Sequence, residues 1–160
     1  MIKKNIKFKD FDGTEGNIDA FFNLTKTECI DLNLQYEDKG GLIGYLKELL
    51  ANRTEQGEIR QKPAVDFVRK IVEMAYGVRP KEDPTLFLKE DDNGRKYVQR
   101  FKQSAAYDAF VFSLLSGEES LDAFVEGIMP EISPEQKKEA ENMMKKEGLT
   151  NLIEMKPLDA

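Results

Sequence analysis

The sequence predicts an α+β fold that is mainly helical, in which an N-terminal β-hairpin packs on a bundle of five or six helices and a C-terminal helix is loosely attached. Apolar residues alternate with polar ones at the start of the chain, and they recur at helical spacing afterwards. Apolar residues make up 40% and charged residues 34% of the 160 positions, which is typical of a folded globular protein. We expect a core domain over residues 1–130, then a C-terminal helix and flexible tail over residues 131–160.

The first two segments are predicted to form the hairpin. Apolar residues occupy even positions in residues 1–9 and again in residues 17–25, so each strand has one apolar face. A two-residue turn would pair even positions with odd ones and mix the two faces. A loop of three or five residues within Asp12–Gly16 instead pairs Phe8 with Ile18 and keeps one face apolar. We therefore expect that loop and that register.

The first helix is predicted from a cap. Thr25 followed by Glu28 is a capping box, in which each side chain satisfies the other residue's free backbone N–H. A helix is therefore expected from Lys26. Its apolar positions would be Cys29, Ile30 and Leu34.

Further helices follow from apolar spacing and from turn residues. Pro63 suits the first turn of a helix that Gly77 would cap. Phe87, flanked by Leu86 and Leu88, fits a short edge strand, and residues 92–94 are predicted to form a turn. Phe112 points away from the apolar face of its helix, so we expect that helix to be buried on both sides or else covered by a partner. The predicted segments are residues 42–52, 63–76, a helix from about 97, and residues 104–116 and 121–129.

The C-terminal part differs from the other helices. Ser133 and Pro134 open a last helix whose apolar stripe is narrow, with Met143 and Met144 at its centre, and Gly148 ends it. Such a stripe buries little apolar area, so its docking should be weak. The segment is either a loosely packed helix with a frayed tail or a partner-binding segment that becomes ordered on contact. The tail adds Leu149, Leu152, Ile153 and Met155.

No catalytic or metal-binding pattern stands out. The chain has no histidine, which removes Ser-His and Cys-His pairs and histidine metal ligands. Cys29 is interpreted as a small buried apolar residue. In a calcium loop begun at Asp10, Glu15 would take the glycine position and Phe21 the position of the bidentate glutamate. We predict a protein that is not an enzyme and has no cofactor and no metal.

Charge and hydropathy limit the classes of partner that we expect. The net charge is −6, and the basic cluster of Lys3, Lys4, Lys7 and Lys9 is interpreted as the solvated face of a strand, opposite Ile6 and Phe8, rather than as a nucleic-acid site. No apolar run approaches the roughly 18 residues needed to span a bilayer, so no membrane is expected. No secretory signal is recognised at the start, and we expect a cytosolic protein.

Four stretches carry a family resemblance. They are KDFDGTEGNIDAFFNLTKTE, FVRKIVEMAYGVRP, LFLKEDD and QSAAYDAFVFSLLSGEESLDAFVEGIMP. In this order they resemble the tail assembly chaperones of long-tailed, siphovirus-type phages and prophages of Gram-positive bacteria. The resemblance covers residues 1 to about 130.

The resemblance implies a function that composition does not supply. Proteins of this family, like the lambda-type chaperones, bind the long tape-measure protein, keep it soluble and help tail-tube subunits polymerise around it. The resemblance further implies the host bacterial cytoplasm as location, absence from the mature virion, a longer form made by programmed frameshifting, and no catalytic residues. The partners implied are the tape-measure protein, the tail-tube protein and that long form.

Apolar residues that the core does not need are the candidates for contact with the tape-measure protein. They are Phe112, Met143, Met144, Leu149, Leu152, Ile153 and Met155. One alternative is a small structural or adaptor protein of the tail that stays in the particle. Another is a hydrolase or nuclease that uses carboxylates and a metal. The oligomeric state does not follow from the sequence, although unpaired hairpin edges would allow copies to associate.

Overall fold

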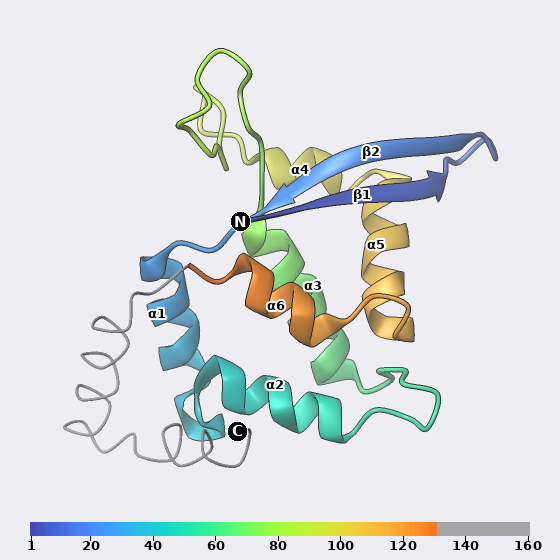
Figure 1. The fold of residues 1–160 in the computed structure, drawn as a ribbon, viewed down its shortest axis with the longest axis vertical. Helices are drawn as coiled ribbons and strands as arrows, with labels where there is room; N and C mark the ends of the chain where they lie inside the picture. Colours follow the sequence, from blue (N-terminus) through green and yellow to red (C-terminus); the bar gives the residue numbers. More distant parts are fainter. Residues whose placement is uncertain (131–160) are drawn as a thin grey trace. The chain divides into compact units, whose positions relative to one another are not determined.

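The computed structural model describes residues 1–130, which fall into two compact units. One unit comprises residues 1–24 and 53–129, and the other is built on residues 25–52. An antiparallel sheet that contains the N-terminal hairpin is followed mainly by helices, which confirms the predicted α+β class (Figure 1). The helix predicted from Ser133 lies outside the described residues.

The sheet of the first unit has three antiparallel strands in the order β1-β2-β3. They are β1 (Ile2–Lys9), β2 (Glu15–Phe22) and β3 (Tyr76–Gly77). β1 and β2 form the predicted hairpin, and even positions pair with even positions, as the one-sided apolar pattern requires. β3 pairs with Phe21 and Phe22, at the end of β2 farthest from the hairpin loop.

The hairpin register differs from the prediction by two residues. Phe8 pairs with Gly16, not with Ile18, and the five-residue loop runs over residues 10–14, not within Asp12–Gly16. The loop begins at Asp10 because the Asp10 carboxylate accepts hydrogen bonds from the backbone N–H groups of Asp12 and Thr14. In addition, a Cβ on Gly16 would lie 2.6 Å from Cζ of Phe8, so the missing side chain makes room for the Phe8 ring. The predicted parity and loop length are confirmed, and the predicted position is wrong.

The helices of this unit are α3 (Lys62–Ala75), α4 (Tyr97–Phe101), α5 (Ala105–Ser116) and α6 (Leu121–Ile128). Pro63 lies in the first turn of α3 as predicted. The expected cap at Gly77 is wrong, because Tyr76 ends α3 and Gly77 pairs with Phe21 in the sheet. A Cβ on Gly77 would lie 2.5 Å from the Phe87 ring. Beside it, Val78 and Leu88 form an isolated bridge, which is the short strand pairing considered for that segment.

An aromatic cluster joins the sheet to the helices. The Phe22 side chain is fully buried, with its ring centroid 5.1 Å from that of Phe110 and 5.2 Å from that of Phe124. Tyr76 and Phe101 stack on each other at 4.2 Å, and both contact Phe22 edge-on. Packing of this kind adds specific geometry to the burial of large apolar area. The β3 end of the hairpin is therefore fixed in the core.

The second unit consists of α1 (Lys26–Gln35), the short 3₁₀ helix η1 (Glu37–Lys39) and α2 (Gly41–Ala51). The capping box of Thr25 with Glu28 is present as predicted. Asn33 accepts a hydrogen bond from the first turn of α2, at Leu42 N, over 2.9 Å.

The apolar face predicted for α1 is wrong in two of its three positions. Cys29 is buried together with Leu32, while Ile30 and Leu34 are 58% and 57% exposed. Residues three or four apart share a helix face, so Cys29 and Leu32 form one face and Ile30 and Leu34 another. The short helix has too few apolar residues for spacing alone to identify which pair faces inward.

Candidate binding surface

The described residues expose large apolar side chains that the core does not use. In residues 1–130 these are Met1, Phe11, Ile30, Leu34, Leu86 and Phe112. Singly exposed apolar residues are normal on protein surfaces. Phe11 and Phe112 nevertheless stand out, because they are large rings exposed by 83% and 63%.

Phe112 is the one predicted contact residue that falls within the described part of the chain. It lies on α5, whose opposite side is buried through Phe110 and Leu114. Burial of α5 on both sides is therefore not what the structure has, and the Phe112 side is exposed. One turn earlier on the same face lies the exposed Asp108. The other predicted contact residues, Met143, Met144, Leu149, Leu152, Ile153 and Met155, lie outside the described residues.

Phe11 is in a five-residue loop whose backbone is held by its own first residue. Asp10 Oδ1 accepts hydrogen bonds from Asp12 N at 2.9 Å and from Thr14 N at 2.8 Å. Asp10 N donates to Thr14 O at 2.8 Å, and Gly13 N donates to Asp10 O at 3.0 Å. Gly13 has a φ of +83°, which favours glycine. Phe11 itself takes part in none of these bonds.

The same loop occurs twice more in this unit. In residues 91–95, Asp91 Oδ1 accepts from Asn93 N and Arg95 N, both at 2.9 Å, and Asp91 N donates to Arg95 O at 2.8 Å. Gly94 N donates to Asp91 O at 3.0 Å, as Gly13 N does to Asp10 O. In residues 54–58, Thr54 takes the place of the aspartate, and its hydroxyl accepts from Glu58 N at 3.1 Å.

The three loops can be compared by the residue that each has at its second position. That position holds Phe11 in the hairpin loop, Glu55 in the loop of residues 54–58 (the second loop) and Asp92 in the loop of residues 91–95 (the third loop). All three side chains are exposed. The third position holds Asp12, Gln56 and Asn93. The loop geometry therefore forms with a polar residue where the hairpin has a phenylalanine.

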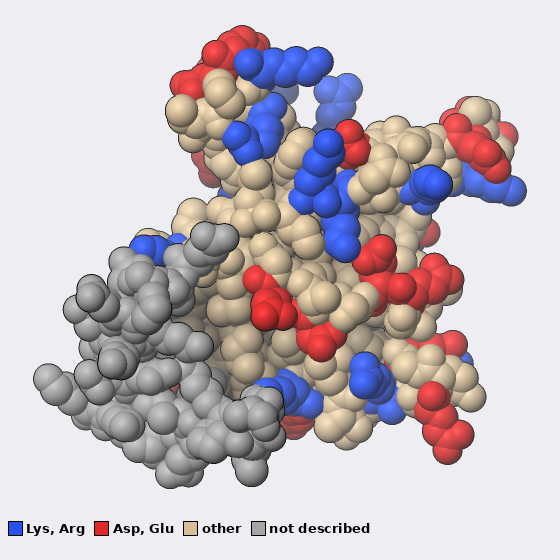
Figure 2. All heavy atoms as spheres, viewed as in Figure 1, with Lys and Arg blue, Asp and Glu red and all other residues tan. Residues whose placement is uncertain are grey.

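The end of the hairpin is acidic, and the strands behind it are basic on one face. Asp10, Asp12 and Glu15 lie in or directly beside the loop, and Figure 2 shows acidic side chains gathered at this end. On the outer face, Lys3, Lys7 and Lys9 are exposed as predicted. These lysines are a solvated strand face, in agreement with the sequence-based interpretation.

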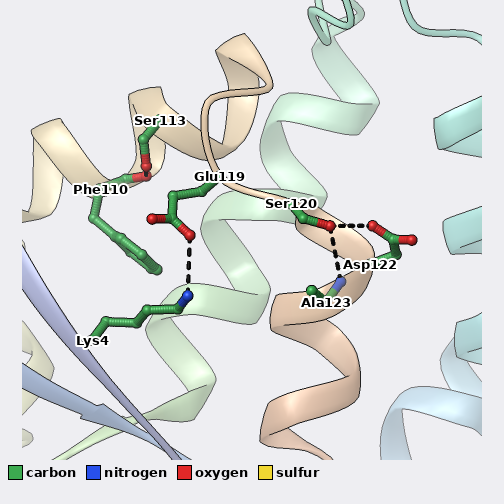
Figure 3. A network of polar contacts seen from close by, with 7 residues as sticks. All are labelled: Lys4, Phe110, Ser113, Glu119, Ser120, Asp122 and Ala123. Carbon is green, nitrogen blue, oxygen red and sulfur yellow. Dashed lines mark hydrogen bonds and ion pairs between the residues drawn. The ribbon is translucent and has the colours of Figure 1, made fainter.

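Lys4 departs from that interpretation. It shares the inner face with Ile6, and its Nζ lies 3.0 Å from Glu119 Oε2 in the segment between α5 and α6 (Figure 3). The two side chains are partly exposed, and pairs of this kind stabilise a protein by less than about 1 kcal/mol. In the same segment, Ser120 accepts from Ala123 N and donates to the Asp122 carboxylate, which lowers the Asp122 pKa.

A polar cluster joins α3 to the segment around the start of α5. The Tyr107 hydroxyl donates to Glu73 Oε2 at 3.0 Å, and Lys102 Nζ lies 2.8 Å from Glu73 Oε1. Burial is the main cause that raises the pKa of Tyr107, and the hydrogen bond with Glu73 raises the pKa of Lys102. Each charged group has a partner within the cluster, so the arrangement serves packing between elements.

Within residues 1–130, no three or more Cys, Asp or Glu side chains are gathered so that they could hold a metal ion. Among the helices of the same residues, none has the length and apolar character to cross a membrane.

Phe11 is not among the contact residues predicted from the sequence. The signal that could have found it is the repeat of Asp-x-[Asp/Asn]-Gly at residues 10–13 and 91–94. Aligned on their glycines, the two segments put Phe11 beside Asp92 and reveal an apolar residue at a position that accepts a polar one.

Comparison with protein families gives a match over most of the chain. A protein-family model described as "phage tail assembly chaperone" matches residues 1–157, which is nearly the whole chain. The match agrees with the resemblance found in the sequence and extends it beyond residue 130. No curated protein and no solved structure matches the chain significantly.

Proposed function

The chain belongs to the phage tail assembly chaperone family, and we propose that it binds the tape-measure protein, keeps it soluble and promotes polymerisation of the tail tube around it. The observation that carries this proposal is the family match over residues 1–157. The family is described by a role in assembly rather than by a reaction, and we propose that the chain acts without catalysis.

The surface of the described residues is compatible with a chaperone of this kind. A protein that holds an aggregation-prone client needs apolar side chains that its own fold can spare. Phe112 is such a side chain, because it is exposed while the opposite side of α5 is buried. We propose that Phe112, Met143, Met144 and the apolar residues of the tail contact the tape-measure protein, and that the chain is a two-part molecule with its core in residues 1–130.

The remaining parts of the proposal concern the setting. We propose that the chain acts in the host bacterial cytoplasm and leaves before the virion is complete. The tail-tube protein and a frameshifted long form of the chain are further proposed partners. Detection of the chain in purified virions would contradict this and favour a structural or adaptor protein of the tail.

Co-expression with the tape-measure protein tests the proposal. The chain carries an affinity tag, and the soluble fraction and the pull-down are both measured for the tape-measure protein. We expect the tape-measure protein to become soluble and to co-purify. Chains truncated before Ser133 or after Gly148 should capture less of it. Failure of the full chain to solubilise or capture the tape-measure protein contradicts the proposed function.

Point variants separate contact residues from core residues. Phe112→Ser and the pair Met143→Ala with Met144→Ala should weaken capture and leave the melting temperature within a few degrees of the unmodified chain, because an exposed side chain contributes little to folding. Asp108→Ser, one turn from Phe112 on the same exposed face, is the matched control and should retain capture. A large fall in melting temperature would assign the substituted residue to the core.

A further inference from the structure

We propose that Phe11 is an anchor that enters an apolar pocket rimmed by basic side chains on the client protein. The proposed contact is made by the tip of the hairpin, defined as the loop of residues 10–14 together with Glu15. This inference rests on the proposed function and adds the residue and the chemistry by which the client is bound.

The first support is that the fold does not require an aromatic ring at this position. Three loops of the unit share one backbone hydrogen-bond pattern, and the other two carry Glu55 and Asp92 where the hairpin carries Phe11. The bonds that hold the tip come from Asp10 and from the backbone. A phenylalanine that is 83% exposed in such a place adds nothing to the loop and leaves apolar area in water.

The second support is that the tip is accessible and already shaped. The loop end of the hairpin extends past α5 (Figure 1), and β3 pairs with Phe21 and Phe22 at the opposite end of β2. Because Asp10 holds the loop through two hydrogen bonds, little backbone entropy is left to lose on binding. Rigidly presented aromatic side chains that fill a pocket are frequent hot spots of protein interfaces.

The third support is the charge of the hairpin tip, which indicates the kind of pocket that would accept Phe11. Asp10 and Asp12 are the sequence neighbours of Phe11, and Glu15 follows the loop opposite Lys9, so the tip carries three acidic residues beside one lysine. A pocket rimmed by Lys or Arg side chains complements this arrangement, whereas an acidic rim would oppose it. The hairpin tip of a second copy is not the occupant, because two tips would bring their carboxylates together.

Binding measured with the purified tape-measure protein tests the inference. Phe11→Asn should weaken the Kd at least tenfold, which corresponds to about 1.4 kcal/mol, with an unchanged melting temperature. Leu86→Asn is the matched control, because it removes another exposed apolar side chain from a loop of the same unit, and its Kd should stay within twofold. Phe11→Leu keeps the position apolar and should retain most of the affinity.

A second variant tests the charge. Asp12→Asn places at the tip the residue that Asn93 provides in the third loop, so the loop should keep its shape. We expect a Kd two- to fivefold weaker at low salt, and a smaller loss of affinity on adding salt than in the unmodified chain.

The outcomes separate this inference from the proposed function. If the unmodified chain binds and Phe11→Asn binds equally well, the anchor is refuted while the chaperone proposal stands. Equal weakening by Phe11→Asn and Leu86→Asn also refutes it, since the effect would not be specific to the tip. If the unmodified chain does not bind the tape-measure protein, the proposed function and the anchor fail together.

Discussion

The two ends of the β1–β2 hairpin use the same amino acid in opposite ways. At the β3 end, Phe22 has no exposed surface and contacts four other aromatic rings. At the loop end, Phe11 is 83% exposed. The two residues are eleven positions apart in one hairpin. One end is therefore part of the folding core, and the other end presents an apolar side chain that the fold does not use.

This difference has a physical origin in what each position faces. Phe22 is on the inner face of the sheet, where Phe110 of α5 and Phe124 of α6 pack against it. Phe11 is in a loop that is closed by the Asp10 carboxylate, and no described aromatic ring contacts it closely enough to form a pair. Stability and binding should therefore respond to different ends of the hairpin, and substitutions can test this separation.

The largest expected effect is at the buried end. Phe22→Ala should lower the free energy of unfolding by about 3–5 kcal/mol, because it removes a large ring and leaves a cavity among rings that cannot all close in. Urea denaturation followed by circular dichroism measures the change. Phe11→Ala is the matched control and should change the free energy of unfolding by less than about 0.5 kcal/mol.

Equal losses for the two variants would remove the distinction between the ends. A loss below about 1 kcal/mol for Phe22→Ala would mean that the aromatic cluster is not the core of this unit. In either case Phe22 could no longer serve as the buried reference against which Phe11 is judged dispensable for folding.

The sequence predicts the elements of this fold better than their details. Periodicity of apolar residues identifies the hairpin and the main helices, because one-sided burial dictates that pattern. The register of the hairpin does not follow from it, since a shift by two residues keeps the same face apolar. Two local features decide the register: the hydrogen bonds of the Asp10 side chain and the missing Cβ of Gly16 under Phe8.

Two other features could not be predicted for related reasons. β3 has two residues, Tyr76 and Gly77, and so short a strand has no periodicity to detect. Gly77 follows a helix and resembles a cap, but the tertiary contact with Phe87 determines its role. Of the candidate contact residues, Phe112 could be recognised because it departs from the pattern of its helix. Phe11 lies in a loop, where apolar spacing does not separate exposed from buried residues, and only the repeat of Asp-x-[Asp/Asn]-Gly at residues 10–13 and 91–94 marks its position.

The next effect concerns the rigidity of the exposed end. Asp10→Ala removes the acceptor of two backbone hydrogen bonds and should lower the free energy of unfolding by about 1–2 kcal/mol. It should also weaken binding of the tape-measure protein, because the loop would then lose entropy on contact. Urea denaturation and a binding isotherm measure the two effects.

Asp91→Ala, in the loop of residues 91–95, is the matched control. It breaks the same two bonds in the third loop, so a similar loss of stability is expected. Affinity for the tape-measure protein should be unchanged, because no anchor residue is placed there. If both variants weaken binding to the same degree, loop rigidity at the tip has no special role.

The smallest effect lies between the two ends, at Asp19 on the outer face of β2. A hydrogen bond from the Asn5 amide, followed by the charge of Lys3, lowers the pKa of Asp19 from 3.8. A carboxyl whose folded pKa is depressed contributes stability that is present above its unfolded pKa and is lost as the pH falls through the folded pKa. Asn5→Ala should therefore raise the Asp19 pKa toward 3.8, as followed by NMR titration. The small difference in melting temperature between this variant and the unmodified chain should be present at neutral pH and shrink once the pH falls below 3.8. An Asp19 titration that Asn5→Ala leaves unchanged would show that the Asn5 hydrogen bond does not stabilise the Asp19 carboxylate, which would leave the Lys3 charge as the electrostatic link between the two strands on this solvated face.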